Sequence, residues 1–301
     1  MSKYTLLVGN YGASNIGDEL LHFAARKKLA TQSLPIKTMS PMGGDFPVFP
    51  AGFRSILNLR QWQQACSGLL GCKQVVYGGG GLINSQNKRS YWIWLQILFW
   101  AVFFRKPVSM WGQSFSSKPG FFLRLLLSKV QLIELRDQLS YEFLDNRGLR
   151  IKKADDLALA LSKQEISSIF EKSQLKEVDA LEDIVTSGYT LVNLRYYKAL
   201  KPAKLEHVVN DILKSNKNLV FCAFEQSDVD FHKQYFANTN VKCLSPSAKL
   251  FENAKQAIGM RLHFLICAQK FGLDIQILAY APKVLGFFSD QGQSDIKVLY
   301  K

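Results

Sequence analysis

Short apolar runs alternate along this chain with amphipathic segments, and this order constrains the fold more than any other feature. The first run, residues 4–10, is followed by an amphipathic segment over residues 17–30. Later apolar runs cover residues 73–81, 106–114 and 130–137, and the first two of these contain glycine near their ends. Such alternation predicts an α/β protein with a parallel sheet and covering helices. Ligands of such folds bind at the carboxyl ends of the strands, beside helix N-termini.

The alternation stops once and then restarts. Residues 162–187 are charged and helical in pattern and lack long apolar runs, so we expect an interdomain region there. Strand-like runs then return at residues 189–195, 218–225, 256–260 and 275–280. The chain of 301 residues is therefore predicted to contain two α/β domains, residues 1–161 and 188–301, with a cleft between them.

Composition narrows the class of partner. The net charge of +14 attracts nucleic acid, anionic membrane surfaces or phosphorylated small molecules. No RNP motif, zinc finger or helix-turn-helix pattern is present, so nucleic acid is not expected as a partner. Five cysteines without CxxC pairing indicate core residues in a reducing compartment and no metal site. The first residues lack a signal-peptide pattern and no apolar run reaches 18 residues, so we expect a cytoplasmic protein.

Two glycine-containing segments follow predicted strands in the first half. Asn15, Gly17 and Asp18 would place flexible backbone and a helix N-terminus at the ligand edge, where N–H groups bind anions. The alternative is a tight turn with an acidic residue in the first helical turn. The second segment holds four consecutive glycines, residues 78–81, followed by Asn84. Close approach of backbone to a ligand would explain them, and the alternative is a flexible loop.

Charged side chains follow other predicted strands. Arg136 and Arg195 each come at a strand end, where arginine suits two-pronged binding of phosphate or carboxylate. A surface ion pair is the alternative for Arg136, and Glu225 on its own is a weak signal. Arg261 and His263 lie two positions apart at a strand–helix junction, where the alternative is a helix start whose polar side chains face water.

One uncharged segment has two interpretations. Residues 90–104 carry no charge, include Trp92, Trp94 and Trp100, and are bracketed by basic residues. The segment is too short to span a bilayer comfortably. It is either a buried core helix or a helix that lies in the membrane interface.

The motifs, taken in order, resemble those of the polysaccharide pyruvyl transferase family. The resemblance covers nearly the whole chain and rests on "SNIGDE" (14–19), "GGGGLIN" (78–84), "GQS" (112–114), "LRDQLS" (135–140), "ADDLALAL" (154–161), "VNLR" (192–195), "GMRLHFLICAQKFG" (259–272) and "AYAPKV" (279–284). The most specific parts are "GMRLH" and the order and separation of the two glycine motifs. The loop after Gln113 departs from the family, which has more glycine and a proline there.

The resemblance implies two Rossmann-like domains similar to the GT-B glycosyltransferase fold. It implies transfer of pyruvate from phosphoenolpyruvate to two hydroxyls of a sugar, with ketal formation, in a surface glycan or its lipid-linked precursor. The N-terminal domain would face the acceptor and the C-terminal domain the donor. A lipid-linked acceptor would suit peripheral binding at the inner face of the plasma membrane, with an anionic membrane surface as partner.

The same resemblance implies roles for particular residues. Arg136 and Arg261 would bind the two anionic groups of the donor, and His263 would donate a proton. The substrate-binding set would comprise Asn15, Gly17, Asp18, Gly79, Gly80, Gly81, Asn84, Gln113, Arg195, Glu225 and Leu262. No cofactor or metal is expected, because arginines can neutralise the phosphate.

The sequence leaves two other functions open. The first is a GT-B-like glycosyltransferase that uses a nucleotide sugar, in which Glu225 would bind the ribose hydroxyls. The second is a catalytically inactive glycan-binding or scaffold protein at the membrane. An intact Arg261–His263 pair argues against the second.

Overall fold

The chain divides into two compact units. A computed structural model describes residues 3–52, 57–83, 88–144, 148–173, 175–180 and 188–299. Unit 1 comprises Met1–Ala13 and Leu21–Ala160, and unit 2 comprises Ser14–Leu20 and Leu161–Lys301. The short segment of residues 14–20 therefore belongs with the second half of the chain, although it lies near the N-terminus in sequence.

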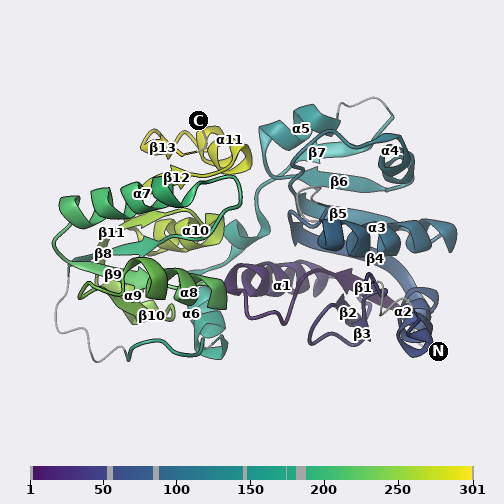
Figure 1. Ribbon diagram of the computed structural model, residues 1–301. Coiled ribbons are helices and arrows are strands. Elements are labelled where there is room, and N and C mark those ends of the chain that lie inside the picture. Colours follow the sequence, from purple (N-terminus) through teal and green to yellow (C-terminus); the bar gives the residue numbers. More distant parts are fainter. Residues whose placement is uncertain are drawn as a thin grey trace. The chain divides into compact units, whose positions relative to one another are not determined.

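Unit 1 is built on a seven-stranded parallel sheet of order β3-β2-β1-β4-β5-β6-β7 (Figure 1). Its strands are β1 (Tyr4–Val8), β2 (Ile36–Ser40), β3 (Phe46–Pro47), β4 (Cys72–Gly80), β5 (Val108–Gln113), β6 (Leu132–Leu135) and β7 (Ile151–Lys153). Its helices are α1 (Ile16–Leu29), α2 (Leu59–Gly71), α3 (Lys88–Phe103), α4 (Phe121–Leu127) and α5 (Gln138–Leu144), with the 3₁₀ helix η1 (Leu157–Ala160). The first turns of α1 belong to unit 2.

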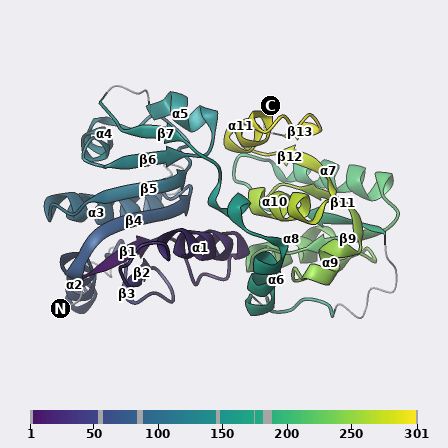
Figure 2. The ribbon, with the colours of Figure 1, turned by 180° about the vertical axis from the view of Figure 1, so that it is seen from behind.

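Unit 2 is built on a six-stranded parallel sheet of order β10-β9-β8-β11-β12-β13 (Figure 2). Its strands are β8 (Tyr189–Asn193), β9 (Leu219–Cys222), β10 (Lys242–Leu244), β11 (Ala254–Gly259), β12 (Asp274–Ala279) and β13 (Ile296–Val298). Its helices are α6 (Lys163–Lys172), α7 (Pro202–Ser215), α8 (Gln226–Tyr235), α9 (Ala248–Glu252), α10 (Leu262–Phe271) and α11 (Pro282–Asp290).

The two sheets share a strand order. In unit 1, β2 and β3 are added in turn on one side of β1, and β4 to β7 are then added on the other side of β1. In unit 2, β9 and β10 are added on one side of β8, and β11 to β13 on its other side. The direction reverses between β1 and β4 in unit 1 and between β8 and β11 in unit 2. This is the doubly wound Rossmann arrangement, whose ligands bind where the order reverses, beyond the carboxyl ends of the strands. The prediction of two Rossmann-like α/β domains is confirmed.

The segment expected to link the domains, residues 162–187, falls within unit 2. Its helix α6 begins with a capping box, in which Ser162 and Glu165 bond to each other's backbone. The ring of Phe170 on this helix stacks on Phe251 at 5.5 Å and meets Phe224 edge-on at 6.1 Å. Despite its charged sequence, α6 therefore has an apolar face that packs onto the core of unit 2.

Helix α3 combines the two interpretations offered for residues 90–104. Trp94, Leu95, Leu98 and Ala101 are buried against the sheet of unit 1, and Trp94 donates from Nε1 to Ser90 Oγ at 2.9 Å. Trp92, by contrast, is 56% exposed. Trp94 is thus a core residue, as the core interpretation of this segment expected, whereas Trp92 lies on the outer face of the helix. Among the described residues, no helix is both long and apolar enough to cross a membrane.

Candidate functional site

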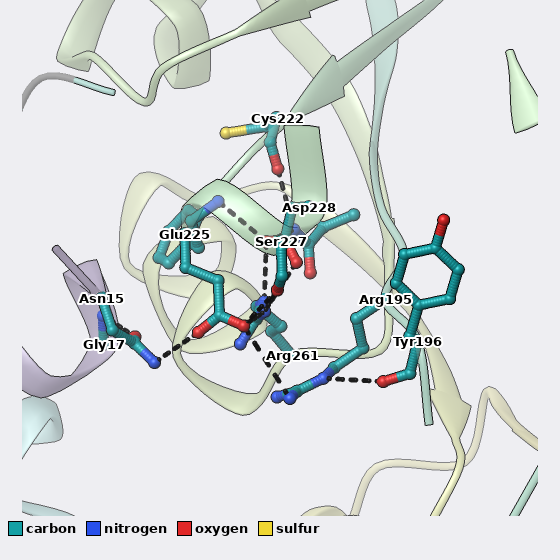
Figure 3. Close-up of polar contacts among 11 residues, drawn as sticks. Asn15, Gly17, Arg195, Tyr196, Cys222, Glu225, Ser227, Asp228 and Arg261 are labelled. Carbon is teal, nitrogen blue, oxygen red and sulfur yellow. Dashed lines mark hydrogen bonds and ion pairs between the residues drawn. The ribbon is translucent and has the colours of Figure 1, made fainter. Parts of the chain in front are cut away.

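The strand reversal of unit 2 carries a cluster of charged side chains (Figure 3). Strand β11 ends at Gly259, and Arg261 forms the N-cap of α10. The guanidinium of Arg261 is 7% exposed and donates to both carboxylate oxygens of Asp228, from Nε at 2.7 Å and from Nη2 at 2.6 Å. Asp228 also accepts from Phe224 N at 2.9 Å and from Asn193 Nδ2 at 3.1 Å, and it is fully buried. Arg261 is therefore held in a fixed orientation by a buried carboxylate.

A second carboxylate closes the cluster from the partly exposed side. Glu225 is the N-cap of α8, and its Oε1 lies 2.5 Å from Arg261 Nη2 and 3.9 Å from Arg195 Nη2. Ser227 donates its hydroxyl to the same oxygen. The Glu225 side chain is 22% exposed, whereas Asp228 is not exposed at all. Two arginines thus share one partly exposed carboxylate at the ligand edge of the sheet.

The protonation states of these groups follow from their partners. Burial favours the neutral form of Glu225, but the charges of Arg261 and Arg195 outweigh it and lower the pKa of this carboxyl. Burial likewise opposes the charge of Arg261, yet Asp228 and Glu225 raise the pKa of its guanidinium further. Glu225 and Arg261 are therefore both ionised at neutral pH, and the cluster pairs two arginines with one buried and one partly exposed carboxylate.

Residues 14–20 bring the start of α1 to this cluster. Ile16 N donates to Phe224 O at 3.0 Å, which ties the segment to the end of β9. Asn15 accepts from Gly17 N at 3.0 Å through Oδ1 and donates from Nδ2 to Glu225 Oε2 at 2.8 Å. The N-termini of α1, α8 and α10 therefore meet around the Glu225 carboxylate. Because helix N-termini carry partial positive charge, this position favours an anion.

His263 packs against the same segment. A Cβ atom added to Gly17 would lie 2.4 Å from His263 Nδ1, so the imidazole rests directly on the glycine backbone. His263 is half-buried in the first turn of α10, and Leu262 precedes it as the first residue of that helix. Glycine is required at residue 17 because any side chain would push the imidazole away.

The glycine run of unit 1 forms the end of β4 at the corresponding reversal. Gly79 and Gly80 have φ of +91° and +89°, a region that favours glycine. At Gly78 an added Cβ would lie 2.0 Å from the hydroxyl of Tyr11, which donates to Gly78 O at 3.0 Å. Backbone conformation and internal packing therefore account for these three glycines, and Gly81 follows them directly. Asn84 lies outside the described residues.

Arg136 and Gln113 lie inside unit 1. Arg136 follows β6, is 8% exposed and forms an ion pair with the buried Asp156. Gln113 ends β5, is 1% exposed, and its Nε2 donates to Trp111 O at 3.1 Å. Both side chains are thus occupied by internal partners.

The predicted site residues consequently fall into two groups. Unit 2 brings together Asn15, Gly17, Asp18, Arg195, Glu225, Arg261, Leu262 and His263. Unit 1 holds Gly79, Gly80, Gly81, Gln113 and Arg136. Sequence reasoning missed Asp228 and Asn193, which orient Arg261. Both positions carried a signal in the sequence. Asn193 lies two residues before the strand-end Arg195, and Asp228 lies in the first turn of the helix that follows β9.

Comparison with known proteins identifies the class. The sequence profile of the polysaccharide pyruvyl transferase family matches residues 15–272, and the chain therefore belongs to this family. The prediction of the family and of an enzyme of this class is confirmed. A search among curated proteins finds no match for the chain.

Solved structures agree on the fold. The UDP-GlcNAc 2-epimerase of Methanocaldococcus jannaschii has a TM-score of 0.56 at 10% identity, with 99% of this chain and 88% of that chain covered. The S. aureus MnaA–UDP structure has a TM-score of 0.60 at 8% identity, with 99% and 84% covered. A putative UDP-N-acetylglucosamine 2-epimerase from Listeria monocytogenes has a TM-score of 0.56 at 8% identity, with 96% and 82% covered. At such identities the likeness shows the GT-B-like fold and nothing more.

Proposed function

We propose that the protein transfers pyruvate from phosphoenolpyruvate to two hydroxyls of one sugar residue in a surface glycan or its lipid-linked precursor. A proton adds to the methylene carbon of the donor and produces an oxocarbenium-like centre. One sugar hydroxyl attacks this carbon and loses its proton. The second hydroxyl then replaces phosphate at the same carbon and loses its proton. The products are a cyclic ketal and inorganic phosphate, and no redox step or cofactor is needed.

Arg261 is the proposed anion-binding residue. Asp228 and Glu225 engage its Nε and Nη2, while no bond to its Nη1 is found within the described part of the chain. Asp228 fixes the plane of the guanidinium, so an incoming phosphate or carboxylate meets an oriented donor. The partly exposed Glu225 is the group that an anionic ligand would displace. The backbone N–H of Leu262, at the start of α10, adds a further donor.

His263 is the proposed proton donor. Imidazole titrates near neutral pH, which suits general acid catalysis. The ring lies in the same helical turn as Arg261 and rests on the Gly17 backbone. A donor bound at Arg261 would therefore present its methylene carbon to a histidine that is already positioned. Asn15 and Arg195 are proposed to contact the substrates around this point.

Arg136 is proposed as the second cation for the donor, and unit 1 as the side that binds the acceptor. Support for Arg136 comes from its place at a strand end within the "LRDQLS" motif. Its ion pair with Asp156 means that donor binding would require a change of partner. The test of this role is whether substitutions of Arg136 weaken phosphoenolpyruvate binding as substitutions of Arg261 do.

The pairing of Arg261 with His263 at the strand reversal of unit 2 is the observation that carries the proposal. The direct test is incubation with phosphoenolpyruvate and a panel of synthetic and lipid-linked glycosides. We expect stoichiometric phosphate release and an acceptor whose mass increases by one ketal-linked pyruvate. Phosphate release without a modified acceptor, or no release with any acceptor, would contradict it.

The rival hypothesis is a glycosyltransferase that uses a nucleotide sugar, and the three similar structures reported above carry names that refer to UDP compounds. That hypothesis needs Glu225 for ribose hydroxyls. Glu225 is instead engaged by Arg261 and Asn15, so its carboxylate already has partners other than ribose hydroxyls. Thermal shift assays decide between them, because only the true donor should raise the melting temperature at micromolar to millimolar concentration.

A further inference from the structure

Most of the net positive charge of the chain comes from one stretch that lacks acidic residues. Between Asp45 and Glu134 the sequence contains no aspartate or glutamate. The same 88 residues contain ten basic residues, namely Arg54, Arg60, Lys73, Lys88, Arg89, Arg105, Lys106, Lys118, Arg124 and Lys129. This stretch alone therefore supplies +10 of the net charge of +14. It includes α2, α3 and α4 of unit 1.

These three helices lie side by side (Figures 1 and 2). Trp62 on α2 meets Trp100 on α3 edge-on at 6.3 Å. The ring centroids of Phe99 on α3 and Phe122 on α4 are 6.2 Å apart. The ring contacts make one continuous aromatic layer over the three helices. Its inner side packs into the core of unit 1.

The outer side of this layer is apolar and exposed. On α3, Trp92, Phe99 and Phe103 follow one another at helical spacing, and Trp92 and Phe103 are 56% and 63% exposed. On α4, Phe121 is 86% exposed and Leu125 is 50% exposed. We call Trp92, Phe99, Phe103, Phe121, Phe122 and Leu125 the α3–α4 patch. Of the ten large hydrophobic side chains that are exposed in the described residues, five belong to this patch, which marks it as an interaction surface.

Exposed cations border the patch. Lys88 and Arg89 begin α3, Arg105 follows it, and Lys118 and Lys129 lie on either side of α4. All five are exposed, and no carboxylate in the described part of the chain forms an ion pair with any of them. Their charge is therefore uncompensated, unlike that of Arg136, Arg195 and Arg261.

We propose that the α3–α4 patch docks the protein onto the surface of an anionic lipid bilayer. Aromatic side chains flanked by uncompensated lysines and arginines match the two layers of such a surface, because the rings enter the acyl boundary and the cations bind the headgroups. A protein partner of ordinary interface composition would not require three neighbouring helices that contain no acidic residue. The partner is thus identified by charge complementarity together with the exposed aromatic residues.

Vesicle binding tests the proposal. We expect the full chain to float with phosphatidylcholine vesicles that contain one-quarter phosphatidylglycerol, to bind pure phosphatidylcholine at least about tenfold more weakly, and to dissociate as salt rises. Replacing the exposed apolar side chains in Phe121→Ser/Leu125→Ser should weaken binding about tenfold or more. Met42→Ser is the matched control, since Met42 is 60% exposed outside the patch. It should bind as wild type does.

The charge contribution has its own matched pair. Lys118→Glu/Lys129→Glu and Lys214→Glu/Lys217→Glu change the net charge equally, but only the first pair borders the patch. Equal weakening by both pairs would reduce the effect to net charge and overturn the proposal. Trp92→Phe should abolish most of the blue shift in tryptophan emission on binding, because Trp94 is already buried.

Three further outcomes would overturn the proposal. One is a wild-type protein that does not bind anionic vesicles. The second is a Phe121→Ser/Leu125→Ser variant that melts like wild type and still binds normally. The third is self-association of the wild type in solution that this variant abolishes, with no vesicle binding, which would assign the patch to a second copy of the chain. Melting curves for every variant keep unfolding from being mistaken for lost binding.

Discussion

The two units share a strand order but differ in what lies at the reversal. In unit 2 the reversal carries Arg261, paired with a buried and a partly exposed carboxylate. In unit 1 the end of β4 carries glycines packed against Tyr11, and the strand-end arginine of that unit, Arg136, pairs with the buried Asp156. The same topology thus supplies two places for a ligand, while the partly exposed cluster of arginines and carboxylates lies in unit 2. Topology predicts where a site can be, and side chains decide whether one is built.

The largest effect is expected at His263, which lies at the reversal of unit 2. His263→Gln keeps the size and polarity of the side chain but cannot act as an acid near neutral pH. We expect turnover to fall by about two to four orders of magnitude while phosphoenolpyruvate affinity stays within about threefold. Single-turnover kinetics and calorimetry measure the two quantities. Turnover close to that of wild type would remove the main chemical difference between the units.

The next largest effects are expected at the two buried arginines, Arg136 in unit 1 and Arg261 in unit 2. Arg261→Ala removes the arginine partner of Asp228, and Arg136→Ala removes that of Asp156. Both aspartates are buried. We expect each alanine variant to lose about 3–5 kcal/mol of unfolding free energy, because an unpaired buried charge remains. Denaturant titration measures this loss.

Lysine variants separate stability from binding. Arg261→Lys and Arg136→Lys keep the charge but lose the planar fork, so partial recovery of stability is expected for both. If both residues bind the donor, both lysine variants should weaken phosphoenolpyruvate binding. Weaker binding in Arg261→Lys alone would make Arg136 a structural residue and restrict the donor site to unit 2. Unchanged affinity in both would refute the proposed donor site.

Two glycines provide the third comparison. Gly17→Ala introduces a Cβ 2.4 Å from the half-buried His263 ring, which can move aside. We therefore expect turnover to fall by about 10- to 100-fold with little loss of stability, since small displacements of reacting groups are costly. Gly78→Ala places a Cβ 2.0 Å from the hydroxyl of the buried Tyr11, and about 1–3 kcal/mol of stability should be lost. Loss of stability rather than turnover in Gly17→Ala would show that this glycine serves packing, as Gly78 does.

The comparison also shows what a sequence can predict. Both sheets were predictable, because apolar runs such as residues 72–80 and 189–193 can only be buried strands between helices. The strand-end positions of Arg136, Arg195 and Arg261 followed from the same pattern. The family itself was predictable from the motifs, and the profile match confirms it.

Tertiary partners were not predictable from the sequence. Nothing in the local pattern of residues 14–20 reveals that Asn15 bonds to Glu225, which lies 210 positions away. The helical spacing of residues 90–104 shows an apolar segment, but which tryptophans face the core depends on the sheet beneath, so the sequence left both interpretations open. The place of Asp228 after β9 could have marked it as a candidate site residue, but its pairing with Arg261 is seen only in the tertiary structure.

The smallest expected effect concerns Glu225, the partly exposed carboxylate that distinguishes Arg261 from Arg136. If this carboxylate occupies the place of an anionic ligand, Glu225→Gln removes a competitor. Phosphoenolpyruvate should then bind roughly fivefold more tightly, the factor that corresponds to about 1 kcal/mol for charges 4 Å apart in water. Calorimetry measures the change. Weaker binding would show instead that Glu225 helps to build the donor site.

The same variant has a signature in acid. The pKa of Glu225 is lowered in the folded protein from its ordinary value of 4.5, because Arg261 and Arg195 outweigh the opposing effect of burial. The unfolded chain therefore binds the proton first, so this contribution to stability is complete above about pH 4.5 and is lost as pH falls toward the folded pKa. The difference in unfolding free energy between wild type and Glu225→Gln should shrink over that range. Glu177→Gln is the control, since Glu177 also has a lowered pKa but is 67% exposed beside Lys233, where solvent screens the pair. A Glu225→Gln profile that runs parallel to wild type, as we expect for Glu177→Gln, would mean that the Arg261 cluster does not depend on this carboxylate.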